Sequence, residues 1–142
     1  MIMEPTELRI GNFIQYNSPD HSICFDLVVG INYSDDFHVH MVELHGRTPI
    51  NINGISPIPI TPEWLERLGF ERKYKNENTI HWVKFSAKHL SFVITECSSL
   101  FGMEYNAYGA DHCPQIFHIH QLQNLYHALT GQELTVKELT AI

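Results

Sequence analysis

The spacing of the short apolar runs along this chain is the feature that most constrains its fold. Runs of strand length are separated by turn-length linkers throughout, except across residues 61–69, where the pattern is helical. A parallel pair of strands needs a crossover of about a dozen residues or more, whereas an antiparallel pair needs only a tight turn. The linker lengths therefore predict an α+β fold in which the sheets are antiparallel.

The first sixty residues carry the densest set of strand-like runs. The clearest alternation covers residues 37–43, and the run 24–32 is interrupted by Gly30, which is typical of a bulge or a tight bend. Isoleucines alternate with Asn, Gly and Pro over 51–60, which favours an edge strand. Several short strands with frequent turns favour a small bent antiparallel sheet or an SH3-like barrel. We therefore expect a β-rich subdomain over 1–60 and an α+β subdomain over 61–142, or one continuous domain.

Two segments have the signals of helices. Thr61 is suited to cap the first helix, with Pro62 at its first position and Gly69 after its last turn. Apolar residues recur at helical spacing over 119–130, and Gly131 follows. This second helix is expected to cap an antiparallel sheet, and a short terminal helix is expected near 135–138. The strands of that sheet are expected at 70–75, 79–85, 90–95 and 103–108, with 115–118 at its edge.

Composition and processing signals indicate a cytoplasmic protein. The chain has 44% hydrophobic residues and a formal net charge of −7, which excludes a disordered chain and a wholly cationic nucleic-acid binder. It shows no secretory signal peptide and no apolar run long enough for a membrane helix. Its three cysteines, Cys24, Cys97 and Cys113, are widely spaced, which favours reduced thiols.

Three motifs resemble a known group of proteins. They are Leu8-Arg-Ile-Gly-Asn12, the segment 57–65 with Gly69-Phe70, and His120-Gln-Leu-Gln-Asn-Leu-Tyr126 with 128–131. In this order they resemble a family of uncharacterised small proteins from Bacteroides-type bacteria and their phages or mobile elements. The resemblance implies a phage or mobile-element context, and it supplies no catalytic residue.

Histidine is unusually frequent, with ten residues in the chain. His38 and His40 lie two residues apart on the expected strand 37–43, so both imidazoles would project from one face and could converge on a metal ion. A metal-dependent enzyme built on this pair is one hypothesis. The alternative is that the imidazoles line the solvated face of an amphipathic strand.

Basic residues are concentrated in the window 67–88. It holds six of the nine lysines and arginines and two acidic residues, with aromatic residues interleaved. A cationic hairpin with aromatic side chains can bind phosphates and stack bases, so a nucleic-acid accessory role is a second hypothesis. The alternative is that the lysines protect a sheet edge while the aromatic residues belong to the core. The residues of this candidate site are Arg72, Lys73, Lys75, Trp82 and Lys84.

The segment 98–114 is rich in Gly, Tyr and Asn, which are common in recognition loops. Phe101, Tyr105 and Tyr108 are its candidate contacts with another protein, unless the tyrosines only cover the sheet. Asp111-His112-Cys113 has the residue types of a thiol site, but adjacent residues seldom reach the required geometry. The chain contains no P-loop, GxGxxG, HExxH or GxSxG motif, so no cofactor is expected. The leading hypothesis is a non-enzymatic interaction protein that binds its partner through 98–114 or an exposed edge strand.

Overall fold

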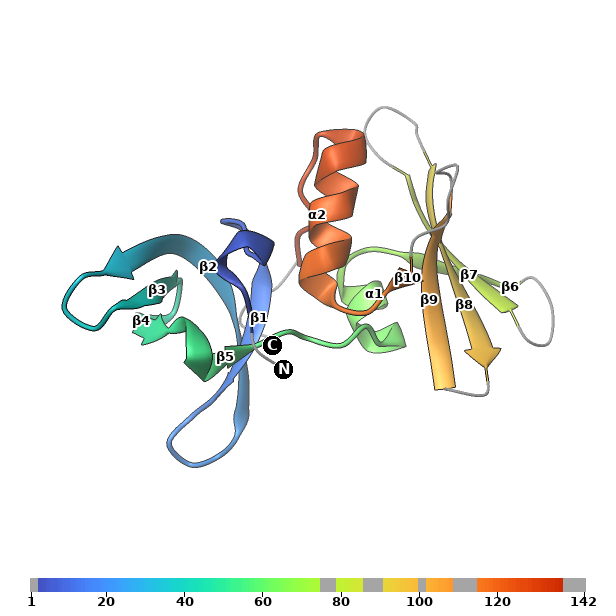
Figure 1. Ribbon diagram of the computed structural model, residues 1–142. Coiled ribbons are helices and arrows are strands. Elements are labelled where there is room, and N and C mark those ends of the chain that lie inside the picture. Colours follow the sequence, from blue (N-terminus) through green and yellow to red (C-terminus); the bar gives the residue numbers. More distant parts are fainter. Residues whose placement is uncertain (1–2, 75–78, 86–90, 100–101, 109–114, 137–142) are drawn as a thin grey trace. The chain divides into compact units, whose positions relative to one another are not determined.

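The computed structural model describes residues 3–74, 79–85, 91–99, 102–108 and 115–136. The chain divides into an N-terminal unit, up to Ile58, and a C-terminal unit, from Pro59 to Lys137. Each unit contains a five-stranded sheet in which all described pairings are antiparallel (Figure 1). The predicted α+β class with antiparallel sheets is confirmed, and the protein is mostly β.

The sheet of the N-terminal unit has the strand order β4-β3-β2-β1-β5. A short 3-10 helix, η1 (Pro5–Glu7), precedes it, and a second, η2 (Ile52–Gly54), separates its last two strands. The strands are β1 (Phe13–Asn17), β2 (Ile23–Ser34), β3 (Val39–Leu44), β4 (Arg47–Asn51) and β5 (Ile55–Ser56).

Strand β2 takes part in two pairings. Its first part pairs with β1, its second part pairs with β3, and the register shifts between Val28 and Gly30. A Cβ atom at Gly30 would collide with the side chain of Glu43, so a larger residue could not occupy this position unless Glu43 moved. The interruption of the strand predicted at Gly30 is confirmed as a register shift, and it lies where β2 passes from one partner strand to the other.

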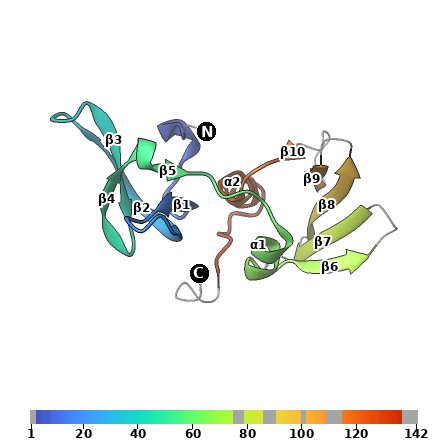
Figure 2. The ribbon, with the colours of Figure 1, turned by 90° about the horizontal axis from the view of Figure 1, so that it is seen from below.

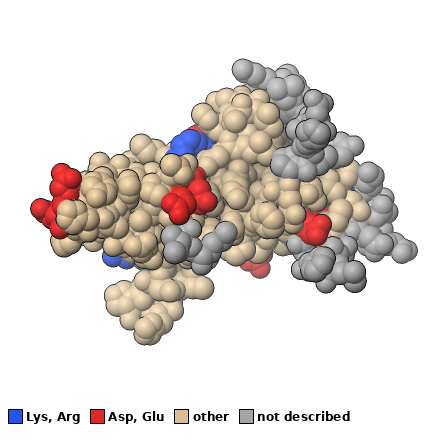
Figure 3. Space-filling view, in the orientation of Figure 1, with Lys and Arg blue, Asp and Glu red and all other residues tan. Residues whose placement is uncertain are grey.

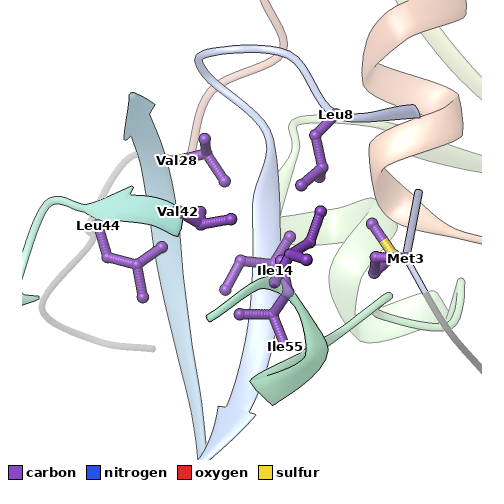
Figure 4. Close-up of a cluster of buried hydrophobic side chains, with 8 residues drawn as sticks. Met3, Leu8, Ile14, Val28, Val42, Leu44 and Ile55 are labelled. Carbon is purple, nitrogen blue, oxygen red and sulfur yellow. The ribbon is translucent and has the colours of Figure 1, made fainter. Parts of the chain in front are cut away.

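The core of the N-terminal unit is aliphatic. Side chains from the start of the chain and from the strands converge around Ile14, which is fully buried (Figure 4). Burial of these side chains is the main favourable contribution to the stability of this unit. The cluster consists of Met3, Leu8, Ile14, Val28, Val42, Leu44, Ile52 and Ile55.

Of the two arrangements expected for residues 1–60, the described strands form the open antiparallel sheet. Strands β4 and β5 are its edges and do not pair with each other. The edge strand expected over 51–60 is confirmed only at β5, and its expected length is wrong because the chain turns at η2. There the Asn51 side chain accepts a hydrogen bond of 2.8 Å from the backbone N–H of Asn53, which stabilises the turn and leaves β5 with two residues.

The sheet of the C-terminal unit has the order β10-β9-β8-β7-β6, and two helices lie on the same side of it (Figures 1 and 2). The expected capping of this sheet by the second helix is confirmed. The elements are α1 (Pro62–Arg67), β6 (Glu71–Tyr74), β7 (Thr79–Phe85), β8 (Ser91–Ser99), β9 (Gly102–Tyr108), β10 (Gln115–Ile116) and α2 (Ile119–Thr130).

Helix α1 begins after the predicted cap Thr61, and both helices end before the predicted glycines. The Thr61 side chain accepts a hydrogen bond of 3.3 Å from the backbone N–H of Trp64. Gly69 and Gly131 follow the two helices with φ angles of 89° and 74°, a region that favours glycine. Residues 135–136, at the start of the expected terminal helix, are not helical, and 137–138 lie outside the described residues.

Aromatic side chains join helix α2 to its sheet. The ring of Phe92 on β8 meets the ring of Tyr126 on α2 edge-on, with centroids 5.3 Å apart. Phe92 also packs edge-on against Phe70, which follows α1, at 6.2 Å. Edge-to-face contacts of this kind add directional packing to the burial of the rings. Trp82 and Ile94 are buried in the same unit.

Candidate functional site

The two histidines proposed as a metal pair do not lie on one strand. Strand β3 begins at Val39, so His38 belongs to the preceding turn, where its φ angle is 52°. His40 is in β3, and its ring packs edge-on against Tyr33 with centroids 5.1 Å apart. The expected strand 37–43 is therefore wrong at its start, because the left-handed turn residue breaks the alternation. Within the part of the chain that the structure describes, no group of three or more His, Cys, Asp or Glu side chains could hold a metal ion.

The basic window forms the predicted hairpin of β6 and β7, but its side chains are used differently from the nucleic-acid hypothesis. Trp82 is only 1% exposed, so its ring is not available to stack on a base. Lys73 is exposed and lies 3.4 Å from the carboxylate of Glu71. Arg72 is exposed on the edge strand β6, and Lys75 lies outside the described residues.

Lys84 is tied to the end of helix α1. Its Nζ atom donates a hydrogen bond of 2.7 Å to the carbonyl oxygen of Leu68, the C-cap residue. Carbonyl groups in the last turn of a helix have no partner within the helix, so the ammonium group satisfies one of them. Lys84 therefore has a structural role in this unit.

Replacing Lys84 with methionine is expected to lower the free energy of unfolding by about 1–2 kcal/mol, because a charge-assisted hydrogen bond is lost. Urea unfolding followed by tryptophan fluorescence measures the change. The control is Lys73→Met, since Lys73 makes an exposed ion pair, which contributes about 0–1 kcal/mol. Equal losses in the two variants would contradict the structural role of Lys84.

The segment proposed as a recognition loop lies largely in strands. Residues 98–99 end β8, and 102–108 form β9. Tyr105 is 7% exposed, so little of it is available to a partner. Tyr108 lies in β9, whereas Phe101 and the Asp111-His112-Cys113 triplet lie outside the described residues.

Tyr105 forms a buried pair with Glu96. The tyrosine hydroxyl donates a hydrogen bond of 2.6 Å to a carboxylate oxygen of Glu96, which is 4% exposed. Burial, and then this carboxylate, raise the pKa of Tyr105 above its ordinary value of 10.0. The hydroxyl therefore remains a hydrogen-bond donor throughout the neutral range. A buried carboxylate is costly without such a donor, so the pair stabilises β8 against β9.

A cavity of about 330 Å³ lies beside this pair, at the edge of the sheet. Glu104 pairs with Cys97 and Tyr105 pairs with Glu96, so these consecutive lining residues of β9 point to opposite faces of the sheet. The cavity therefore opens where the sheet ends. Its lining combines apolar side chains with a carboxylate and an amide, and consists of Pro59, Ile60, Glu104, Tyr105, Gln115, Ile116 and Phe117.

The described strands cover the outer edge of β9 for only part of its length. The two residues of β10 pair with Tyr105 and Asn106. After Ile116 the chain leaves β9, because the carbonyl oxygen of Phe117 accepts a hydrogen bond of 3.2 Å from the backbone N–H of Ile60. Among the described strands, none pairs with the outer edge of residues 102–104.

Other sheet edges of the described chain carry features that oppose strand addition. Edge strand β6 begins with the charged residues Glu71, Arg72 and Lys73, and edge strand β4 contains Pro49. Charged side chains, proline and short length each discourage pairing with another chain. Strand β5 has only two residues. The edge of β9 at 102–104 contains no proline and one charged residue, Glu104, and it continues into the longer strand β9.

The sequence predicts the edge strand near 115–118, but it does not predict the cavity beside that strand. Ile60 and Phe117 come from segments far apart in the sequence, and they are brought together by the hydrogen bond between them and by a bridge from Pro59 to His118. The one sequence feature that points to the cavity is the aromatic residue Phe117, which directly follows the short strand β10. Phe117 is 55% exposed at the cavity, although it follows a buried isoleucine.

Comparisons with protein-family models, with curated protein sequences and with solved structures found no match to this chain. In the described part of the chain, no helix combines the length and apolar character needed to cross a membrane.

Proposed function

We propose that this chain is a non-enzymatic interaction protein that captures an extended segment of a partner protein along the outer edge of β9. The observation that carries the proposal is the edge at residues 102–104, which no described strand covers, beside the cavity of about 330 Å³. An extended peptide can add a strand to such an edge, with backbone hydrogen bonds for affinity and side-chain pockets for specificity.

The lining of the cavity indicates which side chain it would accept. Ile60, Ile116 and Phe117 give it an apolar wall, so it favours a large apolar side chain of the partner. Its volume is at the low end of the roughly 300–1,000 Å³ of small-molecule sites, which favours a side chain over a cofactor. The carboxylate of Glu104 and the amide of Gln115 are available for polar contacts with the same segment.

Three further parts of the proposal have separate support. We propose an SH3-like arrangement for the N-terminal unit, supported by its strand order, by the division of β2 between two partner strands and by the 3-10 helix before β5. A phage or mobile-element context is supported by the resemblance of the sequence motifs. Work in the reducing cytoplasm is supported by the free thiols of Cys24 and Cys97.

Peptides selected against the protein from a displayed random library test the strand-addition site. We expect that selected peptides bind in extended form and that Phe117→Ala weakens their binding about tenfold, because an apolar contact at the cavity is lost. Successive amides of an extended peptide point alternately toward β9 and away from it. N-methylation of an amide that points toward β9 should abolish binding, whereas N-methylation of an amide that points away should be tolerated. Hydrogen exchange at residues 102–104 should slow in the complex.

The matched control is Leu129→Ala. Leu129 on α2 is 56% exposed, close to the 55% of Phe117, and does not line the cavity. Its replacement is expected to leave peptide binding unchanged. The proposal is wrong if no selected peptide loses affinity with Phe117→Ala, or if N-methylation has the same effect at every position.

A further inference from the structure

We infer that the end of the β2–β3 hairpin, residues 33–40, is a second docking surface, which binds a lysine- or arginine-bearing segment of a partner protein. This hairpin end belongs to the N-terminal unit, whereas the strand-addition site belongs to the C-terminal unit. The inference therefore does not depend on the function proposed above, and separate variants test the two.

Aromatic side chains are exposed at this hairpin end. Phe37 is 75% exposed and Tyr33 is 53% exposed, whereas Phe13 of the same unit is 2% exposed. Apolar residues scattered singly over a surface need no explanation, but here one aromatic residue lies at the end of β2 and the other in the turn that follows it. The end of the β2–β3 hairpin therefore presents two aromatic side chains to solvent.

Local contacts hold the turn in shape. The ring of His40 packs edge-on against Tyr33, with centroids 5.1 Å apart. The backbone N–H of Phe37 donates a hydrogen bond of 3.3 Å to the hydroxyl oxygen of Ser34. An ordered surface loses less conformational entropy when it binds than a flexible one does.

The charge at this end identifies the chemistry of the occupant. Asp35 and Asp36 are exposed between the two aromatic residues, and carboxylates mark the end of the hairpin in Figure 3. A lysine or arginine side chain is attracted both by the faces of aromatic rings and by carboxylates. Together these groups favour a cationic side chain over a neutral one.

The charge of the whole N-terminal unit supports the same occupant. Residues 1–58 contain seven acidic residues and only Arg9 and Arg47 as basic ones. The guanidinium of Arg47 lies over the ring of Tyr16, 4.7 Å from its centroid, and Arg9 donates to the carbonyl oxygen of Ile10 at 3.4 Å. The acidic excess attracts a basic protein segment and repels nucleic acid.

A glycine–serine peptide that carries two lysines is the probe, and a peptide with norleucine in place of both lysines is its neutral counterpart. In a titration followed by backbone NMR, the lysine peptide is expected to shift the signals of residues 33–40, and the norleucine peptide is not. Phe37→Ala should weaken binding about three- to tenfold. Asp36→Asn should weaken it and reduce its dependence on salt.

Two control variants separate this surface from general attraction to an acidic protein. Glu4→Gln removes one exposed charge elsewhere in the N-terminal unit, and Ile23→Ala removes an apolar side chain that is 61% exposed. Neither is expected to change binding of the lysine peptide by more than about twofold. Equal shifts with the norleucine peptide, or a loss with Glu4→Gln as large as with Asp36→Asn, would overturn the inference.

Discussion

Replacing Trp82 with alanine is expected to lower the free energy of unfolding by about 3–5 kcal/mol, because it leaves a large cavity in a close-packed core. Trp82 is 1% exposed and lies on the central part of β7, opposite Ile94 of β8. Urea unfolding followed by far-ultraviolet circular dichroism measures the change, and the fluorescence of Trp64 remains as a second probe in the same unit. A loss below about 1 kcal/mol would contradict the burial of this ring.

The matched variant is Trp82→Phe, which keeps most of the aromatic volume. Among the described residues, nothing accepts a hydrogen bond from the indole Nε1 of Trp82. Phenylalanine removes this buried donor, and that gain offsets part of the lost packing. We therefore expect Trp82→Phe to lower the free energy of unfolding by less than about half as much as Trp82→Ala does. A residue that stacks on nucleic acid would give the opposite result, with little change in stability.

Replacing Tyr105 with phenylalanine is expected to lower the free energy of unfolding by about 2–3 kcal/mol, because the buried carboxylate of Glu96 loses its donor. Glu96→Gln should lower the free energy of unfolding less in the Tyr105→Phe background than in the wild type. The difference between the two losses measures the coupling between the two side chains. Urea unfolding of the four proteins supplies the double-mutant cycle.

The same pair has a defined dependence on pH. Since the folded-state pKa of Tyr105 is raised above 10.0, its stabilising contribution is complete below about pH 10 and is lost as the pH rises through the folded-state pKa. Tyr105→Phe should therefore lose less stability above pH 10 than the wild type does. Burial also raises the pKa values of Tyr16 and Tyr126, so some alkaline loss remains in the variant.

The control for the Tyr105 prediction is Tyr33→Phe. Tyr33 is 53% exposed, so loss of its hydroxyl is expected to change stability by less than about 0.5 kcal/mol. Similar losses in the two variants, or additive effects of Tyr105→Phe and Glu96→Gln, would show that the hydrogen bond between Tyr105 and Glu96 does not stabilise the fold.

Features that depend on neighbours in the sequence were predictable. The helix that begins after Thr61 and the helix that ends before Gly131 follow from side-chain capping and from a backbone conformation that glycine adopts readily. The bulge at Gly30 follows from the same local reasoning. Antiparallel pairing followed from linker length, because a short turn can only reverse the direction of the chain.

Features that depend on a single φ angle or on which side of an element is covered were not predictable. His38 was placed on a strand face because it continues an alternating pattern, but its left-handed φ angle ends that pattern. The residue pattern allows Lys84 and Trp82 either to form one binding surface or to be structural, and in the fold the tryptophan is buried and the lysine completes a helix end. Burial of Trp82 depends on which face of the sheet the helices cover, and the residue pattern within β7 does not specify that face.

The sequence by itself determined the local elements of this protein: its helix ends, its bulge and the antiparallel direction of its strands. Tertiary structure alone decided the candidate sites. The cavity joins Ile60 to Phe117, and no described strand covers the edge of β9 beyond Tyr105 because β10 ends after Ile116. The physical reason is that capping and turn energies act between residues close in the sequence, whereas cavities and sheet edges result from packing between distant segments.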